Sequence, residues 1–120
     1  MDGEIAPDEV ADLLGEDGVA VVDIRSRDAY ERGHLPNSVN LPLPELPTSI
    51  ERVGDADRVV TVCPHGKASV RAARLVAASA AVDDAATVES MAGGLEAWDG
   101  DLVADGATAG DDSDAVDAPF

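Results

Sequence analysis

Apolar residues along the chain fall into short runs that are separated by polar and glycine-containing stretches. Two of these runs, 19–24 and 56–62, are rich in valine and show no alternation with polar residues. Such runs are typical of strands buried on both faces of a sheet. Two shorter runs predict further strands at 39–41 and 86–91.

Other stretches have the spacing of helices. Helices are expected at 7–14, at 27–32, at 68–80 and, as a short turn after two glycines, within 93–98. The segment 68–80 is the clearest, because it is rich in alanine and carries an apolar stripe. That stripe consists of Val70, Ala73, Leu75 and Val76.

Strands that alternate with helices predict an α/β fold with a parallel sheet flanked by helices on both faces, in three layers. Pro42, Pro44 and Pro47 predict an irregular segment between two of the strands. Large apolar residues nearly vanish near the C-terminal end. We therefore expect one domain over 1–100 and an acidic, disordered tail over 101–120.

The charge is strongly negative: 25 acidic side chains stand against 8 basic ones, a formal charge of −17. A surface of this sign repels phosphate backbones, so nucleic acid is not an expected partner. The acidity leaves two interpretations, a surface for a basic partner or a surface adapted to high salt. Because the acids are spread over the whole length, we favour the second, as in proteins of halophilic archaea.

The sequence contains no apolar run long enough to span a membrane and begins with acidic residues, unlike a signal peptide. A cytoplasmic protein without a membrane partner is therefore expected. Its single cysteine, Cys63, cannot form an internal disulfide. This thiol follows a predicted buried strand and precedes the helix expected at 68–80, and ligands of parallel sheets bind at such strand ends.

The residues after Cys63 suit the stabilisation of a thiolate. Backbone N–H groups at the start of the helix at 68–80 would lower the pKa of the thiol. Gly66 allows the positive φ that a tight loop needs, and Ser69 can cap the first turn. Lys67, the only lysine of the chain, adds a positive charge beside an anion site.

These residues also allow other interpretations. A lone cysteine after a strand can be an inert core residue. His65 could bind a metal or act as a base, but one cysteine and two histidines are too few for a metal site, and we expect His65 to shape the loop. His34 and Trp98 are expected to be structural. No cofactor is predicted.

Three segments together resemble the single-domain rhodanese-like (sulfurtransferase) family over about residues 5 to 100. The first, "VVDIRSRDAYERGHLPNSVNLP", is similar to the family's upstream Asp-x-Arg and Gly-His-x-Pro signature. The second, "CPHGKAS", resembles its active-site loop, and the third, "MAGGLEAW", its closing Gly-Gly-x-x-x-Trp segment.

This resemblance implies that the protein is an enzyme that transfers a sulfane sulfur through a persulfide on Cys63. The loop would bind the donor and the persulfide through its amides and the charge of Lys67. Asp23 and Arg25 match the Asp-x-Arg signature and are given a supporting electrostatic role. The predicted substrate-binding residues are Pro64, His65, Gly66, Lys67, Ala68 and Ser69.

The resemblance further implies a small anionic donor such as thiosulfate, and a thiol, cyanide or a sulfur-carrier protein as acceptor. Two rival functions remain. A non-catalytic binding or regulatory module could use the same scaffold with its cysteine retained. A cysteine phosphatase of the related fold would need an arginine at the position of Ser69 to hold phosphate in a bidentate manner, and is disfavoured.

Overall fold

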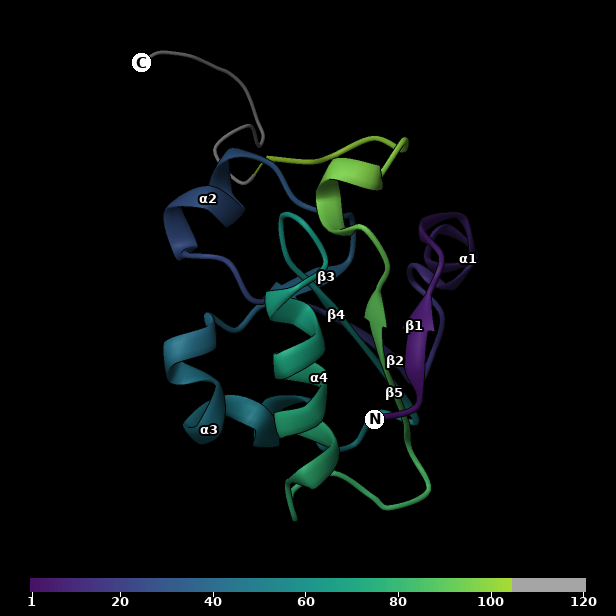
Figure 1. The fold of residues 1–120 in the computed structure, drawn as a ribbon, viewed down its shortest axis with the longest axis vertical. Coiled ribbons are helices and arrows are strands. Elements are labelled where there is room, and N and C mark those ends of the chain that lie inside the picture. Colours follow the sequence, from purple (N-terminus) through teal and green to yellow (C-terminus); the bar gives the residue numbers. More distant parts are fainter. Residues whose placement is uncertain (105–120) are drawn as a thin grey trace.

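The computed structural model describes residues 1–104, which form a five-stranded sheet in the order β1-β5-β4-β2-β3 (Figure 1). All neighbouring strands are parallel. The expected α/β fold with a parallel sheet is confirmed. The strands are β1 (Gly3–Ile5), β2 (Val19–Asp23), β3 (Ser38–Asn40), β4 (Arg58–Val62) and β5 (Thr87–Met91).

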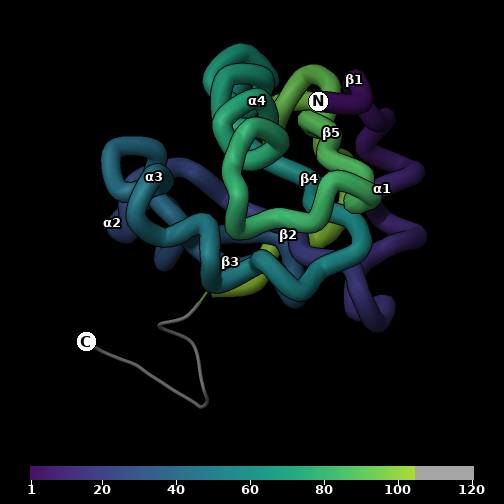
Figure 2. Tube along the Cα trace, turned by 90° about the horizontal axis from the view of Figure 1, so that it is seen from below, coloured from purple at the N-terminus to yellow at the C-terminus, as the bar shows by residue number. Residues whose placement is uncertain are grey.

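Helices cover both faces of the sheet, which gives the expected three layers (Figure 2). The α-helices are α1 (Pro7–Leu13), α2 (Arg27–Arg32), α3 (Leu46–Ser49) and α4 (Ala68–Ala78). Three 3₁₀-helices complete the described part: η1 (Leu43–Glu45), η2 (Ile50–Val53) and η3 (Gly94–Ala97). The helices α3 and α4 pack on one face, and α1 and η3 pack on the other.

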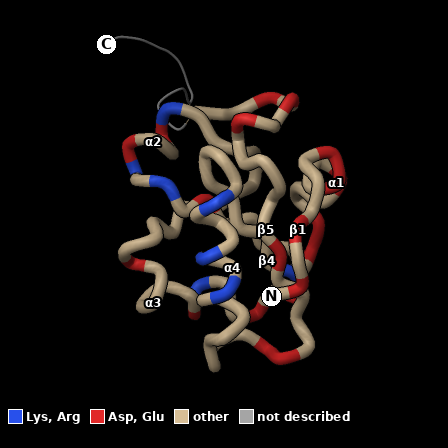
Figure 3. The backbone as a smooth tube through the Cα atoms, viewed as in Figure 1, with Lys and Arg blue, Asp and Glu red and all other residues tan. Residues whose placement is uncertain are grey.

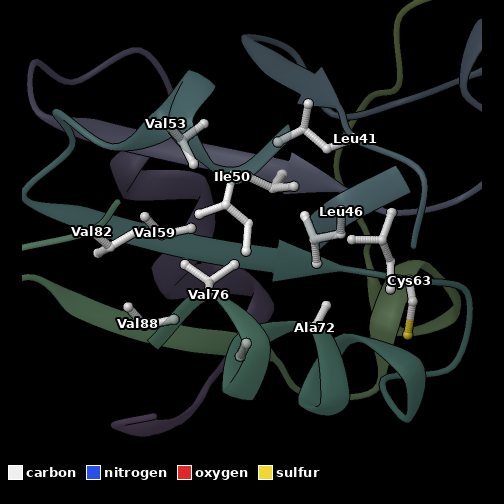
Figure 4. Close-up of a cluster of buried hydrophobic side chains, with 13 residues drawn as sticks. Leu41, Leu46, Ile50, Val53, Val59, Cys63, Ala72, Val76, Val82 and Val88 are labelled. Atoms are coloured by element: carbon white, nitrogen blue, oxygen red, sulfur yellow. The ribbon is translucent and has the colours of Figure 1, made fainter. Parts of the chain in front are cut away.

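The strands supply apolar side chains to both faces, because successive residues of a strand point in opposite directions. On β4, Val59 packs in the cluster beneath α3 and α4, whereas Val60 packs in the cluster beneath α1. Figure 4 shows the first cluster, with Cys63 at one end beside Leu46 and Ala72. The central strands are thus buried on both faces, which explains their uninterrupted apolar runs.

Two parts of the sequence-based prediction need correction. The segment with Pro42, Pro44 and Pro47 is not irregular but forms η1, α3 and η2 in succession. Two of these prolines stand in the first turns of η1 and α3, where proline lacks only an N–H that would be unpaired anyway. The second correction is β1, a strand of three residues that was not expected.

The described part of the C-terminal segment pairs with the domain at one antiparallel bridge. His34 and Val103 exchange two backbone hydrogen bonds of 2.9 Å each, an isolated antiparallel bridge. The predicted disorder of the tail concerns mainly 105–120, which lies outside the described residues. Within 1–104, no helix is both long and apolar enough to cross a membrane.

Candidate active site

Cys63 stands immediately after β4, where the chain turns into the loop that leads to α4. Its Sγ accepts hydrogen bonds from the N–H groups of Gly66 at 3.0 Å and Ser69 at 3.2 Å. The Ser69 hydroxyl oxygen lies 3.2 Å from the same sulfur. Cys63 is only 1% exposed, so its surroundings cover the sulfur almost completely.

These contacts lower the pKa of the Cys63 thiol below its ordinary value. Burial of the sulfur alone would raise the pKa, because it disfavours the charged form. Hydrogen bonds from the Ser69 side chain and from the N–H groups of Ser69, His65 and Gly66 lower it by more. The loop therefore favours the thiolate, the nucleophilic form of cysteine.

The same loop offers N–H groups that are not yet used. No acceptor for the N–H groups of Lys67 and Ala68 lies among the described residues, whereas the N–H of His65 already acts on Cys63 Sγ. Pro64, the remaining loop residue, has no N–H to donate. Two donors, the N–H groups of Lys67 and Ala68, are thus available to an anion that enters the loop beside Cys63.

The loop is held from outside by η3. The N–H of Leu95 donates to the carbonyl of Cys63 at 2.8 Å, and the N–H of Glu96 donates to the carbonyl of Pro64 at 3.0 Å. Gly66 adopts a φ of +83°, and a Cβ there would lie 2.7 Å from the backbone nitrogen of Gly93. Glycine is therefore required at position 66 for both its backbone conformation and its close approach to η3.

The hydroxyl of Ser69 serves the sulfur rather than the helix. Lys67 is the N-cap of α4, and no side chain caps this helix, so the prediction that Ser69 caps the first turn is wrong. Ser69 Oγ lies between Cys63 Sγ and the hydroxyl of Ser90 on β5, at 2.7 Å from the latter. Ser90 was not singled out from the sequence, although a serine between the apolar Val88 and Met91 is an unusual core residue.

Asp23 and Arg25 form a pair near the end of β2. Asp23 is 1% exposed, and its carboxylate accepts hydrogen bonds from Arg25 Nε at 3.0 and 3.1 Å and from Nη2 at 2.8 Å. Arg25 Nη2 also donates to the carbonyl of Gly33 at 2.6 Å. The pair therefore fixes the turn before α2, and no hydrogen bond joins either side chain to Cys63 within the described residues. Its electrostatic support of the site remains a prediction.

The two histidines occupy different places. His65 is exposed, with Nδ1 at 3.7 Å from a carboxylate oxygen of Glu96. His34 is buried, and its Nδ1 lies 2.7 Å from the carbonyl of Tyr30, whose ring stacks on it. Among residues 1–104, no group of three or more His, Cys, Asp or Glu side chains could hold a metal ion.

Basic side chains gather where α4 leaves the loop, in contrast to the acidic remainder (Figure 3). Lys67, Arg71 and Arg74 are exposed and lie on one face of α4, three or four residues apart. None of them forms an ion pair with a carboxylate of the described residues, and α4 itself contains no acidic residue. An anion that approaches α4 thus meets three exposed positive charges along the helix that follows the loop, none of them paired with a carboxylate of residues 1–104.

A parallel α/β domain with a cysteine at a strand end, whose sulfur accepts hydrogen bonds from backbone amides, defines a class of cysteine-dependent enzymes and binding modules. The family model described as "Rhodanese-like domain" matches residues 6–101 of this chain. The chain belongs to the rhodanese-like domain family, as the three sequence segments had indicated.

Relatives with a stated activity support this assignment. The chain is 38% identical over 93 residues to the thiosulfate sulfurtransferase GlpE of Pseudomonas syringae, which covers 77% of this chain and 83% of the relative. It is 27% identical over 90 residues to GlpE of Coxiella burnetii, with 75% and 80% covered. These relatives support a rhodanese-like transferase.

Solved structures show the same fold. A thiosulfate sulfurtransferase from Pseudomonas aeruginosa superposes with a TM-score of 0.70 at 30% identity, over 82% of this chain and 18% of that one. A rhodanese-related protein from Thermoplasma volcanium superposes with a TM-score of 0.69 at 20% identity, over 83% and 96% of the two chains.

Proposed function

We propose that this protein is a sulfurtransferase that moves a sulfane sulfur from a small anionic donor, such as thiosulfate, to a thiophilic acceptor through a persulfide on Cys63. The observation that carries the proposal is the pair of backbone N–H groups, from Gly66 and Ser69, that donate to a buried Sγ. Two fixed N–H donors and a lowered pKa suit a thiolate nucleophile.

In the first half-reaction, the Cys63 thiolate attacks the outer sulfur of thiosulfate. A bond forms between Sγ and that sulfur, while the sulfur–sulfur bond of the donor breaks and its electron pair leaves with sulfite. In the second, an acceptor such as cyanide or a thiolate attacks the outer sulfur of the persulfide, and Sγ leaves as the thiolate. Charge is conserved in both steps, and no outside oxidant or cofactor is needed.

The N–H of His65 and the unused N–H groups of Lys67 and Ala68 would stabilise the negative charge of the outer sulfur, as fixed dipoles do in an oxyanion hole. The ammonium of Lys67 would attract the donor, together with Arg71 on the next turn of α4. Because Cys63 is almost wholly covered, the site suits a donor whose reactive sulfur projects from a small anion.

The acceptor belongs to the same proposal. A thiol, cyanide or a sulfur-carrier protein can present a nucleophile to the outer sulfur, whereas nucleic acid would be repelled by a formal charge of −17. A cytoplasmic location and adaptation to high salt, as in halophilic archaea, are likewise part of the proposal and rest on the composition alone.

The test is a mass spectrum of the intact protein after treatment with thiosulfate or polysulfide. One added sulfur, about 32 Da, is expected on the wild type and should be removed by a thiol. Cys63→Ser should show no adduct, because a hydroxyl is too weakly acidic to replace the thiolate. A wild type that never gains sulfur from any donor contradicts the proposal. Sulfur uptake without transfer to cyanide or a thiol would favour a non-catalytic binding module.

A further inference from the structure

Three hydroxyl groups are buried between the sheet and α4, close to Cys63. Thr61 on β4, Ser69 on α4 and Ser90 on β5 are each 0% exposed. Thr61 and Ser90 are register partners across the two strands and point toward α4. A buried hydroxyl destabilises the fold unless it is hydrogen-bonded, so each of these three requires a partner.

Two of these hydroxyls form a row that ends at the sulfur. Ser90 Oγ lies 2.7 Å from Ser69 Oγ, which lies 3.2 Å from Cys63 Sγ. Ser90 Oγ has no other hydrogen-bond partner within residues 1–104. Thr61 stands outside the row, because its Oγ1 donates to the Ser69 carbonyl at 2.6 Å.

The available acceptors decide which hydroxyl of this row is the donor in each hydrogen bond. Ser69 is the only acceptor for the Ser90 proton in the described structure, so Ser90 donates to Ser69 Oγ. The Ser69 proton then has Cys63 Sγ as its acceptor. If Ser69 instead donated to Ser90, the buried Ser90 proton would be left without an acceptor, which is costly.

We propose that Ser90 is a positioning residue that directs the hydroxyl proton of Ser69 toward Cys63 Sγ and so supports the thiolate. When the sulfur is a thiolate, the Ser90 proton fills the bond to Ser69 Oγ and the Ser69 proton fills the bond to Cys63 Sγ, so every proton of the row has an acceptor. A thiol would add a third proton to the same two bonds, and one buried donor would be unpaired. Donation from Ser90 also polarises the Ser69 hydroxyl and strengthens its bond to the sulfur.

This inference deepens the proposed sulfur transfer and rests on it in one respect, that the thiolate is the reacting species. Negative charge sits on Sγ before it attacks the donor and returns to Sγ when the acceptor removes the outer sulfur. The row from Ser90 would therefore assist both half-reactions without touching the donor.

The experiment measures the rate of alkylation of Cys63 by iodoacetamide as a function of pH, with no sulfur donor present. Ser69→Ala should raise the pKa of the thiol by about one to two units, because it removes a hydrogen bond to a charged group. Ser90→Ala should raise it by a few tenths of a unit up to about one unit, with alkylation about twofold or more slower at a pH below the pKa. Ser90→Thr keeps the hydroxyl and should restore the wild-type profile.

The double variant decides whether Ser90 acts through Ser69. In the Ser69→Ala background, Ser90→Ala should cause no further shift in the pKa. Thr61→Val is the matched control, because it removes an equally buried hydroxyl that donates to the Ser69 carbonyl and is not part of the row. In this variant the pKa of the Cys63 thiol should stay at the wild-type value. Melting temperatures establish that each variant is folded.

An unchanged pKa in folded Ser90→Ala, or an equal shift with and without Ser69, would overturn the inference. Because alkylation needs no donor or acceptor, this result is separate from the proposed function. A protein that transfers no sulfur could still show the shift, and an active sulfurtransferase could lack it.

Discussion

Gly94 lies directly against Cys63: a Cβ at position 94 would overlap the carbonyl oxygen of Cys63. The same Cβ would lie 2.6 Å from the nitrogen of His65, and Gly94 has a φ of +64° that side chains disfavour. A residue 31 positions downstream of the thiol thus limits how the loop can be shaped.

Gly94→Ala should therefore displace the loop around Cys63. The left-handed backbone alone costs about 1–2 kcal/mol, and the overlap with backbone atoms adds to it. We expect a lower melting temperature and a thiol with a more ordinary pKa, measured by thermal unfolding and by alkylation. Gly33→Ala is the control, since its Cβ would only touch Leu102 at 3.5 Å. Equal behaviour of the two variants would contradict the close approach.

Lys67→Ala should weaken capture of the donor but leave the adduct-forming cysteine in place. Loss of a charge-assisted contact to an anion costs about 1.5–3 kcal/mol, roughly tenfold or more in kcat/KM with thiosulfate. Lys67→Arg keeps the charge and should retain much of the activity. Arg52→Ala removes an exposed cation from η2, away from the loop, and should behave as wild type. A similar loss in both alanine variants would point to net charge alone.

The pKa of Cys63 should make stability depend on pH. Because the pKa is lowered in the folded state, the folded protein releases the thiol proton at a lower pH than the unfolded chain, whose thiol has a pKa of about 8.5. Between these two values the free energy of unfolding should rise with pH, and the gain should disappear as the pH falls through the folded-state value. Cys63→Ala should lack this component in urea unfolding measured from pH 5 to 9. Parallel pH curves for the two proteins would show that the thiol is not perturbed.

Salt should stabilise the protein. With 25 acidic and 8 basic side chains, repulsion opposes the compact state most strongly when the Debye length is long, about 10 Å at 0.1 M salt. The melting temperature should therefore rise between about 0.1 M and above about 2 M KCl. A melting temperature that does not change would contradict adaptation to high salt.

Two truncations should separate the attached part of the C-terminal segment from the remainder. Removing 105–120 should leave melting and sulfur transfer unchanged, because this sequence offers too little apolar surface to repay its ordering. Ending the chain after Asp101 also removes Val103 and its two hydrogen bonds to His34. That loss should lower the melting temperature by several degrees. Equal melting of both truncations would show that the bridge contributes nothing.

The sequence was sufficient to predict the central strands and α4, because their apolar runs and alanine content are strong local signals. It did not reveal β1, whose three residues include only one buried side chain, Ile5. This strand is specified by its pairing with β5, which lies more than 80 residues later in the sequence. The helical turns after Pro42 were missed because proline was taken as a breaker and not as a first-turn residue.

In the candidate site, too, the residues close together in sequence were predictable, whereas contacts between distant segments were not. Cys63 and its loop could be located from sequence, since the amides that donate to the sulfur lie within the six residues that follow it. Ser90 could not, because its contact with Ser69 depends on the register between β4 and β5. The paired arrangement of Asp23 with Arg25 was likewise hidden, since a short motif does not tell whether its charges face the site or each other.

The two hydrogen bonds from η3 to the loop also decide which kind of ion the site can accept. They turn the carbonyl oxygens of Cys63 and Pro64 toward Leu95 and Glu96, so these oxygens are not available as ligands inside the loop. The groups that contact the sulfur are the N–H groups of Gly66 and Ser69 and the Ser69 hydroxyl, and N–H groups repel cations. A soft metal ion such as Cu⁺ or Hg²⁺ would then find the thiolate without a second ligand from these two carbonyls. In the proposed sulfur transfer, the backbone orientation of these two peptide groups would therefore favour an anionic sulfur donor over a thiophilic metal ion.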